Sequence, residues 1–179
     1  MHEIEGHGGH TSHSDNPLVI PVSITISILA VLVAGVTLLG HRAHTEELLV
    51  QAKASDQWAY YQAKNIRLRE LQSFADLLGV VTTQDKEKTG EIREKYAKEV
   101  ERYGGDKEDI SKEAKELEKE RDLYQKRANH FDAGEGILEF ALIICSLTLL
   151  TDKRLFWFSG ILIGLAGVIV ALTGFLVHL

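Results

Sequence analysis

Histidines and carboxylates crowd the first sixteen residues of the chain. The histidines are His2, His7, His10 and His13, and the acids among them are Glu3, Glu5 and Asp15. Imidazole together with carboxylate is the ligand set that divalent zinc, copper and nickel prefer. The spacing is loose and rich in glycine, however, and so polar a segment has too little apolar area to fold. We therefore predict a disordered His-rich tail over residues 1–16 and no cofactor, with weak metal capture by the tail as the alternative.

The rest of the sequence carries none of the spacings that familiar catalytic sites need. It has no phosphate-cradling glycine loop, no HExxH pair and no nucleophile elbow. The single cysteine, Cys145, lies in an apolar run, where we expect a small packing residue. Acidic residues outnumber basic ones by 26 to 20, so the excess positive charge that nucleic acid requires is missing. We therefore expect neither an enzyme nor a nucleic-acid-binding protein.

Three charge-poor runs predict three membrane-spanning helices. A helix needs about 20 apolar residues to cross a hydrocarbon core of about 30 Å, and residues 17–40 meet this requirement. Residues 155–177 also do, and the aromatic cluster near their start is typical of a membrane interface. The second span, residues 134–150, is the shortest, and it reaches the required length only by extending back through Glu135 and Asp132. A tight turn at residues 151–154 joins the last two spans.

The distribution of basic residues predicts the orientation. Three spans place residues 41–133 and the carboxyl terminus on one side of the membrane, and the amino terminus and the short turn on the other. Most lysines and arginines near the membrane lie on the side of residues 41–133, and such an excess marks the cytoplasmic side. We therefore predict that residues 41–133 are cytoplasmic and that the amino terminus is outside.

Residues 41–133 are dense in charge and contain no proline, which predicts a long, water-exposed helical hairpin. Glycines and polar runs predict breaks near residues 79–86 and 104–105. Apolar residues recur on both arms at the spacings of three and four that are typical of coiled coils. The seam of the first arm is Leu49, Ala52, Ala59, Ala63, Ile66 and Leu77, and the seam of the second is Ile110, Ala114, Leu117, Tyr124, Ala128 and Phe131. These seams can pack within one chain or between chains.

Small residues line one face of the first span and one face of the third. They are Ser23, Ser27, Ala30 and Ala34 in the first span, and Gly160, Gly164, Ala171 and Gly174 in the third. Such faces let helices approach closely, either within one chain or between chains. The predicted fold is an all-α integral membrane protein, with three transmembrane helices and a long coiled-coil-like hairpin between the first and second.

Ionisable residues are predicted to gather at the membrane surface that faces the hairpin. The alternating directions of the spans bring to one level the residues His41, Arg42, His44, His130, Asp132, Glu135, Glu139 and His178. Glu139 lies about 11 residues, or roughly 16 Å, along the helix from the turn, where an unpaired carboxylate is costly. We expect it to be protonated or to pair with Arg42 or a histidine. Interfacial salt bridging is one interpretation of this group, and a proton or metal site is the other.

The run Lys53–Arg67, with the sequence KASDQWAYYQAKNIR, lies just beyond the first span. It resembles the signature of the bacterial membrane family called domain of unknown function 4337, and the plan of spans resembles that family over nearly the whole chain. The resemblance implies no activity, but it implies a bacterial cytoplasmic (inner) membrane and a role for this run beyond solvation. The residues suited to contact a partner are Lys53, Asp56, Trp58, Tyr60, Tyr61, Lys64 and Arg67. The alternative is that the rings cover the hairpin of their own chain.

These features favour a non-catalytic, membrane-anchored structural or interaction protein, such as a scaffold or an accessory subunit of a membrane complex. It is predicted to self-associate through its coiled coil and through the small-residue spans that include Gly160 and Gly164. The alternative is a metal- or proton-responsive sensor or transport accessory that uses the tail or the group around Glu139. The expected partners are the lipid bilayer and either further copies of the chain or a larger membrane complex. The sequence indicates no particular small-molecule ligand.

Overall fold

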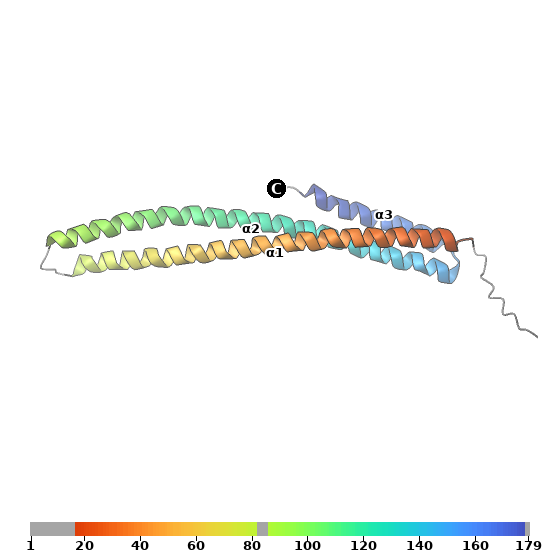
Figure 1. The fold of residues 1–179 in the computed structure, drawn as a ribbon, viewed down its shortest axis with the longest axis horizontal. Coiled ribbons are helices and arrows are strands. Elements are labelled where there is room, and N and C mark those ends of the chain that lie inside the picture. The colour runs from red at the N-terminus through yellow and green to blue at the C-terminus, as the bar shows by residue number, and fades with distance from the viewer. Residues whose placement is uncertain (1–16, 82–85, 178–179) are drawn as a thin grey trace, which may run out of the picture.

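The computed structural model describes residues 17–81 and 86–177, which form three helices. Helix α1 spans Val19–Val80, α2 spans Lys86–Thr151 and α3 spans Arg154–Leu176. Figure 1 shows α1 and α2 side by side and antiparallel over their whole length, with α3 folded back along the last part of α2. Each of the three is long and apolar enough to cross a membrane. The histidines of the tail and His178 lie outside the described residues.

Helix α1 is one continuous rod that contains both the first predicted span and the first arm of the hairpin. It begins at Val19, slightly later than the predicted start at residue 17, and its cap residue Leu18 makes no side-chain cap bond. Pro21 falls in the first turn, where a missing amide donor breaks no helical hydrogen bond. No later proline interrupts the rod. The predicted span and the first arm of the hairpin are therefore parts of one helix without a joint.

Helix α2 also runs unbroken, and the predicted break at residues 104–105 was wrong. Two interior glycines cost a helix roughly 2 kcal/mol relative to alanine. Contacts with α1 on both sides of the pair offset this cost. Lys64 donates to Asp106 at 3.0 Å and lies 4.7 Å from the ring centre of Tyr103, while Lys107 donates to Asn65 at 3.3 Å. The break predicted near residues 79–86 corresponds to the interval between the end of α1 and the start of α2.

The link between α2 and α3 contains only Asp152 and Lys153. Asp152 has a φ of 55°, in the left-handed region that ends many helices and that aspartate tolerates better than most residues. Its amide donates to the carbonyl of Thr148 at 2.9 Å. So short a link forces α3 to return along α2.

The arms of the hairpin pack through one seam on each helix. On α2 four residues of the predicted seam, Ile110, Ala114, Ala128 and Phe131, are buried. Leu117 and Tyr124 are partly buried, and Leu123, which was not predicted, is buried as well. On α1 the buried residues are a different set, which is Gly40, Ala43, Val50, Ala54, Leu68 and Leu71. They recur at intervals of three, four, seven or fourteen residues, as a coiled-coil seam requires. We call this set the inner seam.

The seam predicted on α1 does not pack on α2. Its large members Leu49, Ile66 and Leu77 are 53%, 58% and 57% exposed. The alanines of this seam are exposed as well. Helix α1 thus carries two seams on opposite sides, and only the inner one is covered within the chain.

Glycines allow α3 to pack tightly on α2. A Cβ atom on Gly160 would collide with the thiol of Cys145, and a Cβ on Gly164 would lie 2.7 Å from Leu29. Gly134 of α2 would place a Cβ 2.7 Å from the side chain of Ala171. The small-residue face of α3 is therefore used within the chain, which favours one of the two alternatives left open by the sequence.

Gly134 and Gly136 offer a matched test of this packing. We expect Gly134→Leu to lower the midpoint of thermal unfolding in detergent, because its Cβ would lie 2.7–2.9 Å from the side chain and backbone of Ala171. Overpacking of this kind costs about 1–3 kcal/mol. Gly136→Leu should change the midpoint little, since nothing lies within 4 Å of its Cβ. Equal midpoints for the two variants would contradict this packing of α2 and α3.

Candidate functional site

A group of polar residues lies where the charged arms of α1 and α2 meet the apolar parts of the three helices. We call this group the boundary cluster. Thr37 of α1 donates to a carboxylate oxygen of Glu135 at 2.6 Å. His44 lies 3.0 Å from a carboxylate oxygen of Asp132, and the ring of His130 lies 3.1 Å from the hydroxyl of Thr173 in α3. The cluster thus ties α2 to both of its neighbours at one level.

Gly40 lets α1 and α2 approach closely inside the boundary cluster. A Cβ at this position would lie 3.2 Å from a carboxylate oxygen of Asp132 and 3.5 Å from the Cβ of Phe131. The close approach brings His44, one turn further along α1, to Asp132. The geometry of the boundary cluster therefore depends on Gly40, which has no side chain.

His44 lies between two carboxylates. Its Nε2 is 3.0 Å from Asp132 and its Nδ1 is 3.3 Å from Glu47. An ionised carboxylate can only accept a hydrogen bond, so both contacts are hydrogen bonds only when both ring nitrogens carry protons. The bond to Asp132 is the main cause that raises the pKa of His44 above its ordinary value of 6.5, with Glu47 adding to it. The side chain is 45% exposed, which limits the energy of the pair.

The predicted group does not form one metal site in the described part of the chain. His41 and Arg42 are exposed, and His44, His130, Asp132 and Glu135 divide into the separate contacts described above. Among residues 17–81 and 86–177, no three histidines, cysteines or acids are placed to hold a metal ion. The cluster therefore acts as a set of polar ties between helices.

Glu139 lies apart from the cluster. Neither Arg42 nor a histidine of residues 17–81 and 86–177 pairs with it, and the alternative expectation, a protonated carboxyl, stays a prediction. The preceding residue, Leu138, is fully buried against Gly167 near the middle of α3, whereas Glu139 itself is exposed. The helix places the carboxyl on the outer surface of the apolar bundle. The pairing failed because one residue along a helix rotates a side chain by about 100°.

The run Lys53–Arg67 divides between the two faces of α1. Trp58 donates to Glu118 at 2.9 Å and packs edge-on to Tyr61, with 5.4 Å between the ring centres. Lys64 pairs with Asp106, and this bond raises the pKa of Lys64. These residues hold α2 of the same chain. Lys53, Asp56, Tyr60 and Arg67 are exposed instead.

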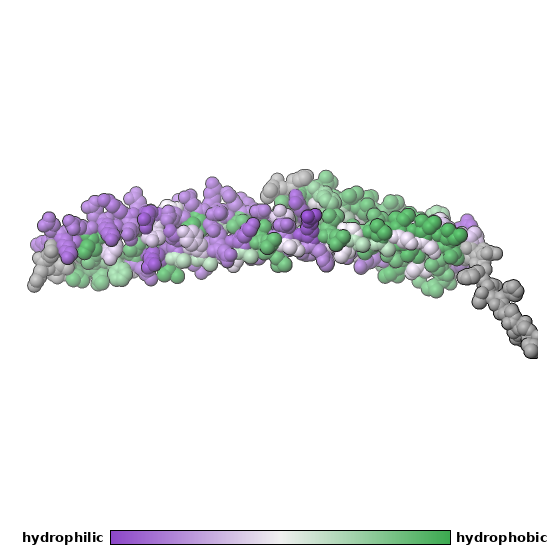
Figure 2. All heavy atoms as spheres, viewed as in Figure 1, coloured by the Kyte–Doolittle hydropathy of each residue, from purple (hydrophilic) through white to green (hydrophobic). Residues whose placement is uncertain are grey.

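We define the outer face of α1 as the side opposite the inner seam. Within the predicted span it consists of Ser23, Ser27, Ala30 and Ala34, and beyond the span it consists of Leu49, Ala52, Ala59, Ala63, Ile66 and Leu77. All of these residues are exposed. In Figure 2 apolar surface covers the half of the molecule that contains α3 and reappears in patches along the hairpin half. The outer face is the candidate interaction site of the molecule.

The inner seam was missed by sequence reasoning, although its spacing is visible in the sequence. Its heptads include partly buried polar positions such as Glu47 and Lys64, which lower the apparent apolarity of this side. The outer face is interrupted by polar residues as well, at Asp56 and Glu70, so apolarity alone does not distinguish the two sides. The two faces of α1 differ in which of their polar residues have partners on α2. Lys64, for example, pairs with Asp106.

The pH dependence of stability tests the role of His44. Because its pKa is raised in the folded chain, the stabilisation is complete below pH 6.5 and is lost as the pH rises through the higher folded value. We expect the midpoint of thermal unfolding to fall over this interval, and His44→Gln to reduce the fall. His41→Gln is the matched control, since the ring of His41 makes no hydrogen bond to a described residue. Identical slopes for the wild type and His44→Gln would contradict the proposed tie.

One family model matches nearly the whole described part of the chain. The model of the family described as domain of unknown function (DUF4337) matches residues 18–177. Neither a curated protein nor a solved structure matches the chain. The match covers α1, the hairpin and α3, so the chain belongs to the family described as domain of unknown function (DUF4337).

Proposed function

We propose that this protein is a non-catalytic, membrane-anchored structural or interaction protein that self-associates through the outer face of α1. The observation that carries the proposal is the exposed second seam on α1, which includes Leu49, Ile66 and Leu77 beyond the span. Extended apolar patches on soluble surfaces mark interaction sites. Burial of one leucine or isoleucine side chain contributes about 1.5–3 kcal/mol, so several such residues support a stable contact.

A second copy of the chain is the partner that fits this face best. Copies inserted in the same direction hold their α1 helices parallel, so corresponding seam residues meet across a two-fold axis. The small residues Ser23 and Ser27 form part of a shallow groove on α1 within the apolar half, and they allow close approach there. One helix therefore offers a contact surface in lipid and in water. The assembly acts as a scaffold or as an accessory to a larger membrane complex, with the hairpin in the cytoplasm of a bacterial cell.

A proton-responsive accessory is the second candidate function. It is favoured by His44, whose two ring nitrogens face carboxylates at the point where the hairpin joins the apolar helices. Loss of one proton removes the positive charge of His44 and leaves one N–H for its two carboxylate neighbours, which weakens the contact between α1 and α2. In this version the hairpin arms would separate with rising pH, as distance measurements between spin labels at the hairpin tip can detect. No change in that distance between pH 5.5 and 8.5 would exclude the version.

Cysteine cross-linking in membranes tests self-association directly. In a Cys145→Ala background, we expect Ala63→Cys to form disulfide-linked dimers on mild oxidation, because this position meets its own copy in a parallel pair. Lys112→Cys is the matched control, since Lys112 is exposed on α2. Adding Leu49→Glu and Ile66→Glu should abolish the dimer. Equal cross-linking at both positions, or none at either, would contradict association through the outer face.

Two acidic residues on the outer face distinguish a second copy from a different partner. Asp56 and Glu70 interrupt the seam and are exposed, and in a parallel pair each lies near its own copy. Like charges in such positions oppose pairing. We expect Asp56→Asn with Glu70→Gln to strengthen dimerisation several-fold in sedimentation experiments in detergent. Weaker dimerisation of this variant would contradict the symmetric pair, because it would mean that the acids have basic partners.

A further inference from the structure

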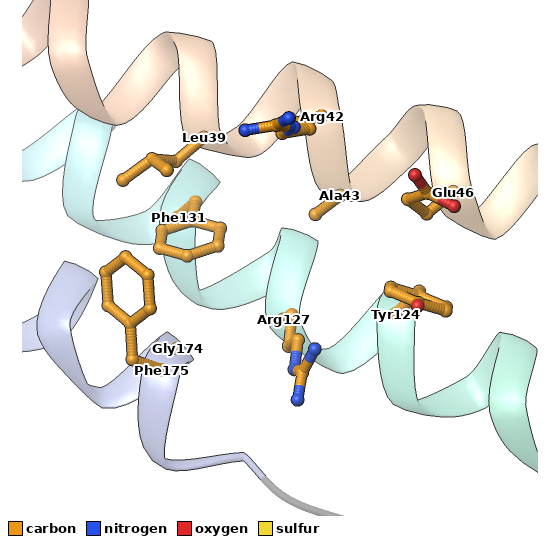
Figure 3. Close-up of a pocket in the computed structure, with 9 residues that line it drawn as sticks. All are labelled: Leu39, Arg42, Ala43, Glu46, Tyr124, Arg127, Phe131, Gly174 and Phe175. Carbon is orange, nitrogen blue, oxygen red and sulfur yellow. The ribbon is translucent and has the colours of Figure 1, made fainter.

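A pocket of about 390 Å³ opens beside the boundary cluster, where the end of α3 lies against the hairpin. All three helices contribute to it, and Figure 3 shows Arg42 on α1, Arg127 on α2 and Phe175 on α3. Its lining combines the apolar residues Leu39 and Phe175 with the charged residues Arg42, Glu46 and Arg127. The pocket is thus placed where lipid headgroups meet water.

The pocket has more positive than negative charge. Arg42 and Arg127 line it together with a single acid, Glu46. Arg42 is exposed and makes no hydrogen bond or ion pair with residues 17–81 and 86–177. Arg127 is half-buried, and its Nε donates to the carbonyl of Val177 at 3.0 Å, while its guanidinium lies 5.7 Å from the ring centre of Tyr124. Within the described chain neither guanidinium has a carboxylate partner.

The opposite wall of the pocket is apolar. The rings of Phe131 and Phe175 pack edge-on with 5.3 Å between their centres, and Leu39 lies beside them. Phe175 is 52% exposed, so this wall is open to the surroundings of α3. A ligand that fits the pocket therefore carries an anionic group at one end and apolar chains at the other.

We propose that this pocket binds the headgroup phosphate of an anionic phospholipid. Guanidinium groups bind phosphate oxygens in pairs of parallel hydrogen bonds, and basic pockets between transmembrane helices are typical sites for lipid headgroups. Two arginines against one glutamate leave one positive charge, which a phosphodiester neutralises. A headgroup with an ammonium would bring a third cation next to the two arginines. The structure therefore favours a headgroup that carries phosphate and no ammonium, such as phosphatidylglycerol.

Native mass spectrometry of the full chain released from lipid nanodiscs tests this site. We expect phosphatidylglycerol to remain bound in preference to phosphatidylethanolamine, and Arg42→Gln to weaken its retention about tenfold, as expected for loss of one charge-assisted contact. The side chain of Arg42 makes no hydrogen bond or ion pair with residues 17–81 and 86–177, so its replacement should leave the fold intact, which circular dichroism checks. Lys126→Gln is the matched control, because it removes one exposed charge from α2 beside the pocket.

Several outcomes would overturn the proposal. Equal retention of the two lipids would mean that the bound molecules are ordinary bilayer lipids. An equal loss on Lys126→Gln would mean that diffuse charge, and not this pocket, attracts them. Displacement of the lipid by millimolar inorganic phosphate would mean that the ligand is a free phosphate. None of these outcomes depends on the oligomeric state. The lipid site is therefore tested independently of the proposed self-association.

Discussion

The seam between α1 and α2 is the constraint on which the rest of the structure depends. Both helices cross from the apolar to the charged half without a break, so their relative rotation cannot change along the way. Once Gly40 is packed on Phe131 and Asp132, the face of every residue on both rods is determined. The polar ties at His44 and Thr37 and the aromatic contact at Trp58 all follow from this one register.

Helix α3 adds a different kind of packing. The hydrophobic effect does not favour helix association in lipid, so close contact between backbones has to supply the attraction. Gly160 and Gly164 provide this contact with α2 and α1, and the tight link at Asp152 keeps α3 in place. Because these glycines are covered within the chain, the small-residue face of α3 is not open to other molecules, whereas the outer face of α1 is exposed.

Much of the architecture could be predicted from the sequence, because it depends on local patterns. Lengths of uncharged sequence predict the helices that can span a membrane, and the spacing from Ile110 to Phe131 correctly identifies the inner side of α2. The continuity of α2 through Gly104 and Gly105 could not be predicted from propensity, because Lys64, about forty residues away, holds the neighbouring turn. The choice between the two seams of α1 likewise depends on residues of α2 that are distant in the sequence. The position of Glu139 on the outer surface, without a partner among residues 17–81 and 86–177, follows from one step of helical rotation, which a prediction of membrane depth alone does not include.

The two sides of α1 differ in their surroundings. One side holds the hairpin together, and the other side is exposed and is the surface that we propose for a second copy. The most direct measurement of this claim is double electron–electron resonance on chains with one spin label, at position 63 in a Cys145→Ala background, in lipid bilayers. Every dipolar distance in such a sample arises between chains, and the account predicts a short, narrow distribution that lengthens when the label is moved to position 112. A sample without any intermolecular dipolar signal at position 63 would contradict the account.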